Sequence, residues 1–152
     1  MGIAVRALAR GWTVLVVQFL KSGDWRAGEQ AVLGGLGATW WTGGDGFTWD
    51  TDDLERSAEL AAAAWAGARD DIAAATHDLV ILDEVTYPMT WGWIDTAEVV
   101  AAIADRPASV SVIATGRDAP AALIDVADTV TEMTNVKHAF DAGIAAKRGI
   151  DL

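Results

Sequence analysis

Two adjacent carboxylates at the end of an apolar run are the side chains of this sequence best suited to chemistry. Asp83 and Glu84 follow directly on the apolar residues 79–82. A short, wholly apolar run is typical of a strand buried on both faces in the middle of a parallel sheet. Ligands bind beyond the carboxyl ends of such strands, so the pattern predicts that Asp83 and Glu84 grip a Mg²⁺–nucleotide at the lip of a sheet. The alternative is a pair of solvated carboxylates at a strand end.

The loop that usually cradles the phosphates of such a nucleotide has no match in the sequence. The pattern G-x-x-x-x-G-K-[ST] occurs nowhere in the 152 residues. Lys21-Ser22 resembles its end, but no glycine precedes the lysine at the required spacing. Gly34-Gly35-Leu36-Gly37 does not match the dinucleotide pattern G-x-G-x-x-G either, and we predict a turn there.

Aromatic residues in two segments could bind a flat apolar ligand, since the chain has eight Trp against one Tyr and three Phe. Phe47 and Trp49 follow a glycine-rich stretch and would share a face if extended, so they could cover a planar ligand. Thr86 and Tyr87 follow the carboxylates directly and begin an aromatic loop at 87–93 that could wall a large ligand. The alternatives are a small hydrophobic cluster and a loop that packs back on the sheet.

Other polar residues give weaker signals. Arg117 stands at a predicted strand end and could hold a phosphate or carboxylate, although a surface salt bridge fits equally well. His138 near Asp141 is more often structural than catalytic. The other histidine, His77, lies at a predicted helix end, so we expect no histidine-based metal site.

The elements that must position these residues alternate between helix and strand. Apolar residues step by four and three between positions 54 and 72, which indicates one face of a long helix, and Asp95-x-x-Glu98 resembles a capping box. We predict loops at 21–30 and 43–46, helices at 2–10, 51–75, 95–104 and 120–127, and strands at 13–20, 38–41, 79–83, 109–114 and 128–133. This order predicts an α/β fold with a mostly parallel sheet and flanking helices, in a single domain over 1–152.

Composition bounds the partners. The chain carries 11 basic and 22 acidic residues, a net charge of −11, which argues against nucleic acid and anionic membrane as partners because both need a basic face. The chain has no cysteine, so thiolate metal sites are excluded. It also lacks an apolar run of membrane-spanning length. We therefore expect a cytoplasmic protein.

In their order along the chain, several segments resemble the ATP:corrinoid adenosyltransferases that carry a P-loop fold. The resemblance covers essentially the whole chain, and the segment near position 136 is its most specific part. The matching segments are Val16-Val17-Gln18-Phe19-Leu20-Lys21, Gly46-Phe47-Thr48-Trp49, Leu82-Asp83-Glu84-Val85-Thr86-Tyr87, Thr115-Gly116-Arg117, Ala127-Asp128-Thr129-Val130-Thr131-Glu132, Val136-Lys137-His138-Ala139-Phe140-Asp141-Ala142-Gly143 and Gly149-Ile150-Asp151.

The resemblance implies a transferase of cobalamin biosynthesis or salvage. Such enzymes move the 5′-deoxyadenosyl group of ATP onto the cobalt of a reduced corrinoid and release triphosphate. The cobalt(I) centre attacks the ribose C5′, while the protein supplies positioning and electrostatics. The resemblance also implies ATP and the corrinoid as substrates, Mg²⁺ as cofactor, an electron-donating reductase as partner, and a homodimer.

Site residues follow from the same resemblance. Glu84, with Asp83 beside it, matches the position that helps to bind Mg²⁺. Phe47 and Trp49 match an aromatic pair that closes over the corrin and makes cobalt easier to reduce by excluding water and an axial ligand. Thr86 and Tyr87 fall beside that site. The residues expected on the nucleotide side are Arg6, Gln18, Lys21 and Arg117.

One departure from the family pattern concerns the N-terminus. The family's phosphate loop, Gly-Asn-Gly-Lys-Gly-Lys-Thr-Thr or close to it, would lie immediately before Met1, with the first strand before that. We therefore expect a P-loop NTPase-like (RecA-like) fold with its first strand and phosphate loop missing, as in a truncated gene model or a lineage that lost the loop. Weak or absent ATP binding would follow. The open alternatives are a non-catalytic corrinoid-binding or dimerisation module and an unrelated P-loop-like ATPase.

Overall fold

A parallel sheet lies at the centre of the computed structural model, which describes residues 1–20, 28–43 and 54–150. Its four strands are all parallel and run in the order β2-β1-β3-β4. The strands are β1 (Val14–Gln18), β2 (Thr39–Thr42), β3 (Leu79–Asp83) and β4 (Ser111–Ala114). The predicted α/β class with a parallel sheet is confirmed, and β3 has the predicted bounds.

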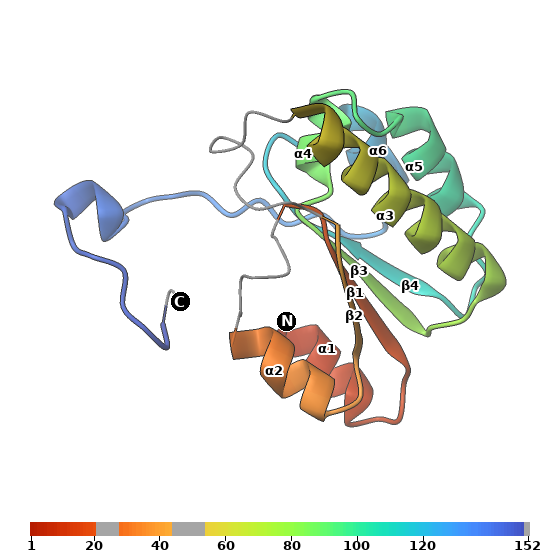
Figure 1. The fold of residues 1–152 in the computed structure, drawn as a ribbon, viewed down its shortest axis with the longest axis horizontal. Helices are drawn as coiled ribbons and strands as arrows, with labels where there is room; N and C mark the ends of the chain where they lie inside the picture. The colour runs from red at the N-terminus through yellow and green to blue at the C-terminus, as the bar shows by residue number, and fades with distance from the viewer. Residues whose placement is uncertain (21–27, 44–53, 151–152) are drawn as a thin grey trace.

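Helices cover both faces of this sheet (Figure 1). One face carries α1 (Gly2–Leu8) and α2 (Gly28–Gly35). The other face carries α3, α5 and α6, with the short α4 beside them. Their bounds are α3 (Leu54–Ala74), α4 (Thr86–Thr90), α5 (Thr96–Ala104) and α6 (Ala121–Val126), and a 3-10 turn, η1 (Phe140–Ala142), follows in the tail.

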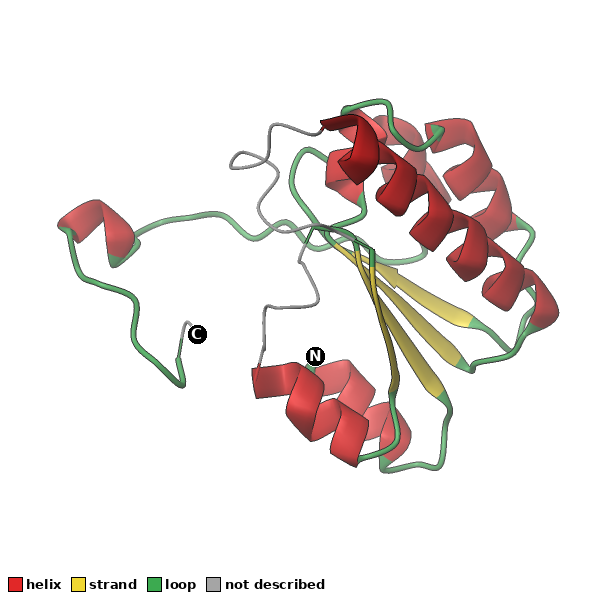
Figure 2. Ribbon diagram, viewed as in Figure 1, coloured by secondary structure: helices red, strands yellow, loops and turns green. Residues whose placement is uncertain are grey.

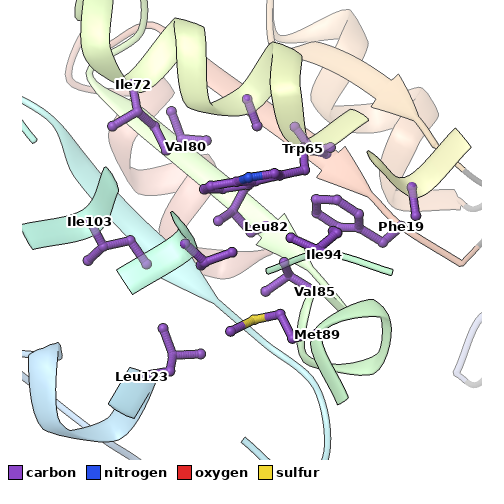
Figure 3. Packing of buried hydrophobic residues seen from close by; sticks show 14 of the residues in the cluster. Phe19, Trp65, Ile72, Val80, Leu82, Val85, Met89, Ile94, Ile103 and Leu123 are labelled. Atoms are coloured by element: carbon purple, nitrogen blue, oxygen red, sulfur yellow. The ribbon is translucent and has the colours of Figure 1, made fainter. Parts of the chain in front are cut away.

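Two hydrophobic clusters, one on each face, explain why the central strands β1 and β3 are apolar except at their last residues. Because side chains alternate along a strand, Val14 and Val16 pack under α1 and α2, whereas Leu15 and Val17 pack under α3. Trp65 of α3 lies over the face that carries α3, α5 and α6, among residues from both the sheet and the helices (Figure 3). Packing on both faces therefore fixes the position of the strands and of their carboxyl ends.

Local signals explain several element boundaries. Asp95 caps α5, since its side chain accepts a hydrogen bond of 2.8 Å from the backbone N–H of Ala97. The apolar face of α3 is confirmed at its buried positions, which include Trp65 and Ile72, but Leu54 at its start is 57% exposed. No helix in the described parts of the chain is both long and apolar enough to span a bilayer.

Three local predictions were wrong. Residues 28–35 form α2, although we expected a loop to position 30 and a turn at 34–37; the turn covers only 36–37, where Gly37 has φ 97°. The aromatic segment after Tyr87 contains the short helix α4 rather than only a loop. Residues 128–133 form no strand, because no described segment offers them a neighbour for a hydrogen-bonded ladder.

Candidate functional site

The carboxyl ends of the parallel strands bring the predicted carboxylates to one edge of the sheet, where the strands draw together in Figure 2. Asp83 is the last residue of β3 and pairs in register with Gln18 at the end of β1. Glu84 follows directly, and both carboxylate residues are half-buried. The expectation that the apolar run delivers these acids to the lip of a sheet is thus met.

Both oxygens of the Asp83 carboxylate accept hydrogen bonds from neighbouring strand ends. The amide nitrogen of Gln18 donates to Oδ2 at 3.1 Å, and the hydroxyl of Thr115, which directly follows β4, donates to Oδ1 at 3.0 Å. Hydrogen bonds to the ionised form of a carboxylate hold it in one orientation. Asp83 is therefore fixed between β1 and β4.

Glu84 has an unusual backbone conformation. Its φ is +63°, a region that residues other than glycine adopt infrequently. Its backbone N–H donates to the Thr115 hydroxyl at 3.0 Å, and its carbonyl accepts from the N–H of Tyr87 at 3.3 Å. The chain thus turns sharply at Glu84 between β3 and α4.

The turn after β4 is tied to α4. The hydroxyl of Thr86, which is 2% exposed, donates to the Arg117 carbonyl at 2.7 Å. Gly116 has φ 143°, and a Cβ built on it would collide with that Thr86 hydroxyl. Tight packing therefore ties the backbone of Arg117 to α4, and the Arg117 side chain is exposed.

The aromatic residues after the acids contact one another in tilted and edge-on arrangements. The Tyr87 ring lies 5.5 Å from that of Trp91, and Trp91 lies 4.7 Å from Trp93 in an edge-on arrangement. Trp91 is 38% exposed. These rings form an aromatic cluster on α4 and just after it, in the segment that follows the carboxylates, and such rings suit contact with a large apolar ligand.

The structure does not gather all the predicted residues. Arg6 lies exposed on α1, and among the described residues no hydrogen bond joins it to the acids. Lys21, Phe47 and Trp49 lie outside the described residues, so their roles stay predictions.

Sequence reasoning missed the parts played by Thr115 and Trp40. The Trp40 indole N–H on β2 donates to the side-chain oxygen of Gln18 at 3.2 Å. A hydroxyl immediately after a predicted strand was the signal that could have identified Thr115.

Asp83 and Glu84 suit Mg²⁺ better than a metal that demands a complete protein cage. Within residues 1–20, 28–43 and 54–150, no three His, Cys, Asp or Glu side chains group closely enough to hold a metal. Mg²⁺ usually keeps several waters and is bound by one or two carboxylates together with substrate phosphates. Two adjacent acids at a sheet edge fit that mode of binding.

A separate polar cluster at the amino ends of the strands serves structure. The backbone and hydroxyl of Thr13 donate to Asp78 at 2.8 and 2.9 Å, and these hydrogen bonds, the backbone one first, hold the pKa of Asp78 below its ordinary value. His77 bonds to Asp71 at 2.7 Å and to Thr39 at 3.1 Å. These contacts tie β1, β3, α3 and β2 together far from the acids.

Comparison with known proteins adds an independent finding. The family model described as "ATP:corrinoid adenosyltransferase BtuR/CobO/CobP" matches residues 1–152. The chain is 41% identical over 150 residues to the corrinoid adenosyltransferase of Escherichia coli K12, covering 99% of this chain and 76% of the relative.

Two further relatives agree. Corrinoid adenosyltransferase CobA of Salmonella typhimurium is 41% identical over 150 residues, with 99% of this chain and 76% of the relative covered. The corrinoid adenosyltransferase of Pseudomonas aeruginosa is 42% identical over 152 residues, with 99% of this chain and 74% of the relative covered. The similarity thus extends over nearly all of this sequence.

Proposed function

The chain belongs to the ATP:corrinoid adenosyltransferase family, and from this premise we propose how its residues serve the transfer of the 5′-deoxyadenosyl group. It is a corrinoid adenosyltransferase homologue and an enzyme of cobalamin biosynthesis. In the reaction, the reduced cobalt donates an electron pair to C5′ of ATP, the cobalt–carbon bond forms, and the C5′–oxygen bond breaks to release triphosphate. The protein contributes orientation and charge stabilisation.

We propose the edge formed by Asp83 and Glu84 as the Mg²⁺ position. Glu84, with Asp83 beside it, would hold the ion, whose charge offsets that of the triphosphate leaving group. The location of both acids at the carboxyl end of β3, next to the turn that carries Arg117, is the observation that carries this proposal. Arg117 then faces the anionic side of ATP, where a guanidinium can form paired hydrogen bonds to phosphate.

The remaining assignments of site residues are proposals by resemblance. By resemblance alone, Gln18, Lys21 and Arg6 would fall on the nucleotide side, and Phe47 and Trp49 would close over the corrin. Thr86 and Tyr87 are assigned beside the reacting centre, and the tilted contact between the rings of Tyr87 and Trp91 supports an aromatic wall there.

Several properties of the whole protein are also proposals. We propose a homodimer, an electron-donating reductase as partner and a location in the cytoplasm. The P-loop NTPase-like (RecA-like) order of the sheet, with the first strand and phosphate loop absent from these 152 residues, is proposed with them.

Adenosylation can be followed by the change in corrinoid absorbance under strong reductant and millimolar MgATP. We expect Glu84→Gln to lower the rate by about 10–100-fold, as for other losses around a metal site. Glu59→Gln, on the exposed side of α3, is the matched control and should leave the rate unchanged. Equal rates for Glu84→Gln and the wild type would refute the metal role of Glu84.

The same assay separates the competing functions. Tryptophan quenching by cobalamin without any product would favour a non-catalytic corrinoid-binding module. Hydrolysis of ATP without corrinoid would favour an unrelated ATPase.

A further inference from the structure

A row of hydrogen-bonded side chains crosses the whole described sheet near its carboxyl ends. The row consists of Trp40 on β2, Gln18 on β1, Asp83 on β3 and Thr115 directly after β4. Three hydrogen bonds link it, at 3.2 Å from Trp40 to Gln18, 3.1 Å from Gln18 to Asp83, and 3.0 Å from Thr115 to Asp83. β2, β1 and β3 thus contribute one member each, and the residue that follows β4 is the fourth.

The row lies on the α1 and α2 side of the sheet. Gln18 shares a strand face with Val16, and Asp83 shares one with Ile81, and both of these apolar residues pack in the cluster under α1 and α2. Gln18 is 2% exposed. A buried amide must satisfy its polar atoms internally, and here the oxygen and the nitrogen of Gln18 each have a partner.

Thr115 closes the row onto Glu84. Its hydroxyl donates to Asp83 and at the same time accepts from the backbone N–H of Glu84. The side chain of one acid and the peptide of the next are therefore clamped by one oxygen atom. Only a hydroxyl among side chains of this size both donates and accepts in this way.

The hydrogen bonds of Thr115 act at a backbone position with an unfavourable conformation. Glu84 has φ +63°, and residues other than glycine keep such a conformation only where the surroundings determine it. Thr115 supplies a hydrogen bond to that peptide, and Asp83 fixes the orientation of Thr115.

We propose that Asp83, Gln18 and Thr115 are positioning residues, and that they set the peptide of Glu84 so that Glu84 is the carboxylate that reaches Mg²⁺. This inference rests on the proposed function, because it takes the metal role of Glu84 from there. It assigns Asp83 to orientation through its two hydrogen bonds, and Gln18 to support of Asp83 rather than to the nucleotide.

Binding of Mn²⁺ in place of Mg²⁺, followed by the electron paramagnetic resonance of the free ion, tests this assignment. We expect Thr115→Val to weaken Mn²⁺ binding about tenfold or more, as when a hydrogen-bond partner of a metal ligand is lost. Thr115→Ser keeps the hydroxyl and should restore binding. The matched control Thr76→Val changes an exposed threonine between α3 and β3, at the amino ends of the strands, and should bind as the wild type does.

Two readouts need no metal. Hydrogen exchange of the Glu84 amide, measured by nuclear magnetic resonance, should accelerate in Thr115→Val and return to the wild-type rate in Thr115→Ser. Gln18→Met keeps the side-chain length without the amide, so it should shift the Trp40 indole N–H resonance and weaken Mn²⁺ binding.

The outcomes separate this inference from the function beneath it. If the wild type binds Mn²⁺ and Thr115→Val binds it equally tightly, the positioning role is wrong and the proposed function stands. If the wild type binds no Mn²⁺ at millimolar concentration, either alone or with ATP present, the metal role of Glu84 is wrong and this inference fails with it. Adenosyl transfer itself is tested by the corrinoid assay.

Discussion

Positive φ angles gather around the candidate site. Glu84, Gly116 and Asp118 all have φ between +53° and +143° and lie at the ends of β3 and β4 or just after them. Such conformations cost free energy and persist where packing and hydrogen bonds enforce them. Thr115 supplies such a contact to Glu84, and Thr86 packs against Gly116.

Gly116→Ala should therefore destabilise the protein. The new Cβ would meet the Thr86 hydroxyl at a φ that alanine rarely adopts, so we expect a loss of about 1–3 kcal/mol in unfolding free energy, measured by urea denaturation. Gly34→Ala is the control: this exposed glycine lies in α2 with nothing near its Cβ position, and alanine there should stabilise by roughly 0.5–1 kcal/mol. Equal stability of the two variants would contradict this reasoning.

Asp78 makes stability depend on pH. Because hydrogen bonds from Thr13 lower the pKa of Asp78 in the folded state, the ionised carboxylate stabilises the fold at pH above the ordinary aspartate value of about 3.9. That stabilisation is lost as pH falls through the lowered folded pKa. Asp78→Asn should thus be less stable than the wild type near neutral pH.

Denaturant unfolding of wild type and Asp78→Asn across acid pH checks this prediction. The difference in unfolding free energy between the two should shrink as pH falls below the ordinary aspartate range. A difference that stays constant into strong acid would show that the hydrogen bonds do not depend on ionisation.

Trp65 is the largest side chain that α3 buries against the sheet, and it is 3% exposed in the core of Figure 3. Trp65→Ala should cost about 3–5 kcal/mol of unfolding free energy, because it leaves a large cavity. The Trp65 indole N–H is buried without a hydrogen-bond partner among the described residues, so Trp65→Phe should cost less than about 1.5 kcal/mol.

Trp12→Ala provides the comparison for Trp65. Trp12 is 44% exposed between α1 and β1, and its removal should change stability by about 0.5 kcal/mol or less. Thermal or urea unfolding of the three variants gives the order directly. A Trp65→Phe variant as unstable as Trp65→Ala would show that the ring shape, and not its volume, holds α3.

Sequence patterns predicted correctly those helices and strands whose formation depends on their own residues alone. The strand at β3 was predicted to the residue because polar positions bound its apolar run, and Asp95 marked the start of α5. Helix α2 was missed because Gly34 and Gly35 disfavour a helix, whereas burial of Leu33 stabilises one. The alternating pattern at 128–133 predicted a strand, but a pattern cannot supply the neighbouring strand that pairing requires.

In the candidate site, too, contacts between neighbours in the sequence were predicted and contacts between distant residues were not. The two acids and the residues after them were predicted from adjacent positions. The links from Asp83 to Gln18, 65 residues away, and to Thr115, 32 residues away, depend on the register between strands. One sequence contains no measure of that register, so these links became visible only in the fold.

On the scale of the whole molecule, the segment after α6 differs from the rest. Residues 127–150 are all exposed, and apart from η1 they form no helix or strand; Figure 1 shows them extending away from the sheet. Phe140 is 79% exposed and Met133 is 93% exposed. Exposed backbone without secondary structure is cut readily by proteases.

Brief digestion with chymotrypsin should therefore cut near Phe140 before it cuts at buried aromatic residues such as Phe19 or Trp65. The shortened protein should keep the unfolding transition of the sheet. Mass spectrometry of the fragments gives the order of cleavage. If cleavage near Phe140 slows as protein concentration rises, the tail is covered in the proposed homodimer.

The parallel sheet has one further consequence, for how such a protein can change. The ties made by Asp78, Thr13 and His77 stand at the amino ends of the strands, while the acids stand at the carboxyl ends. Substitutions at the amino ends can change thermal stability during evolution while the geometry at the carboxyl ends is kept. In protein engineering, the two ends of the sheet could be mutated in separate libraries, and the best variants of each library could then be combined.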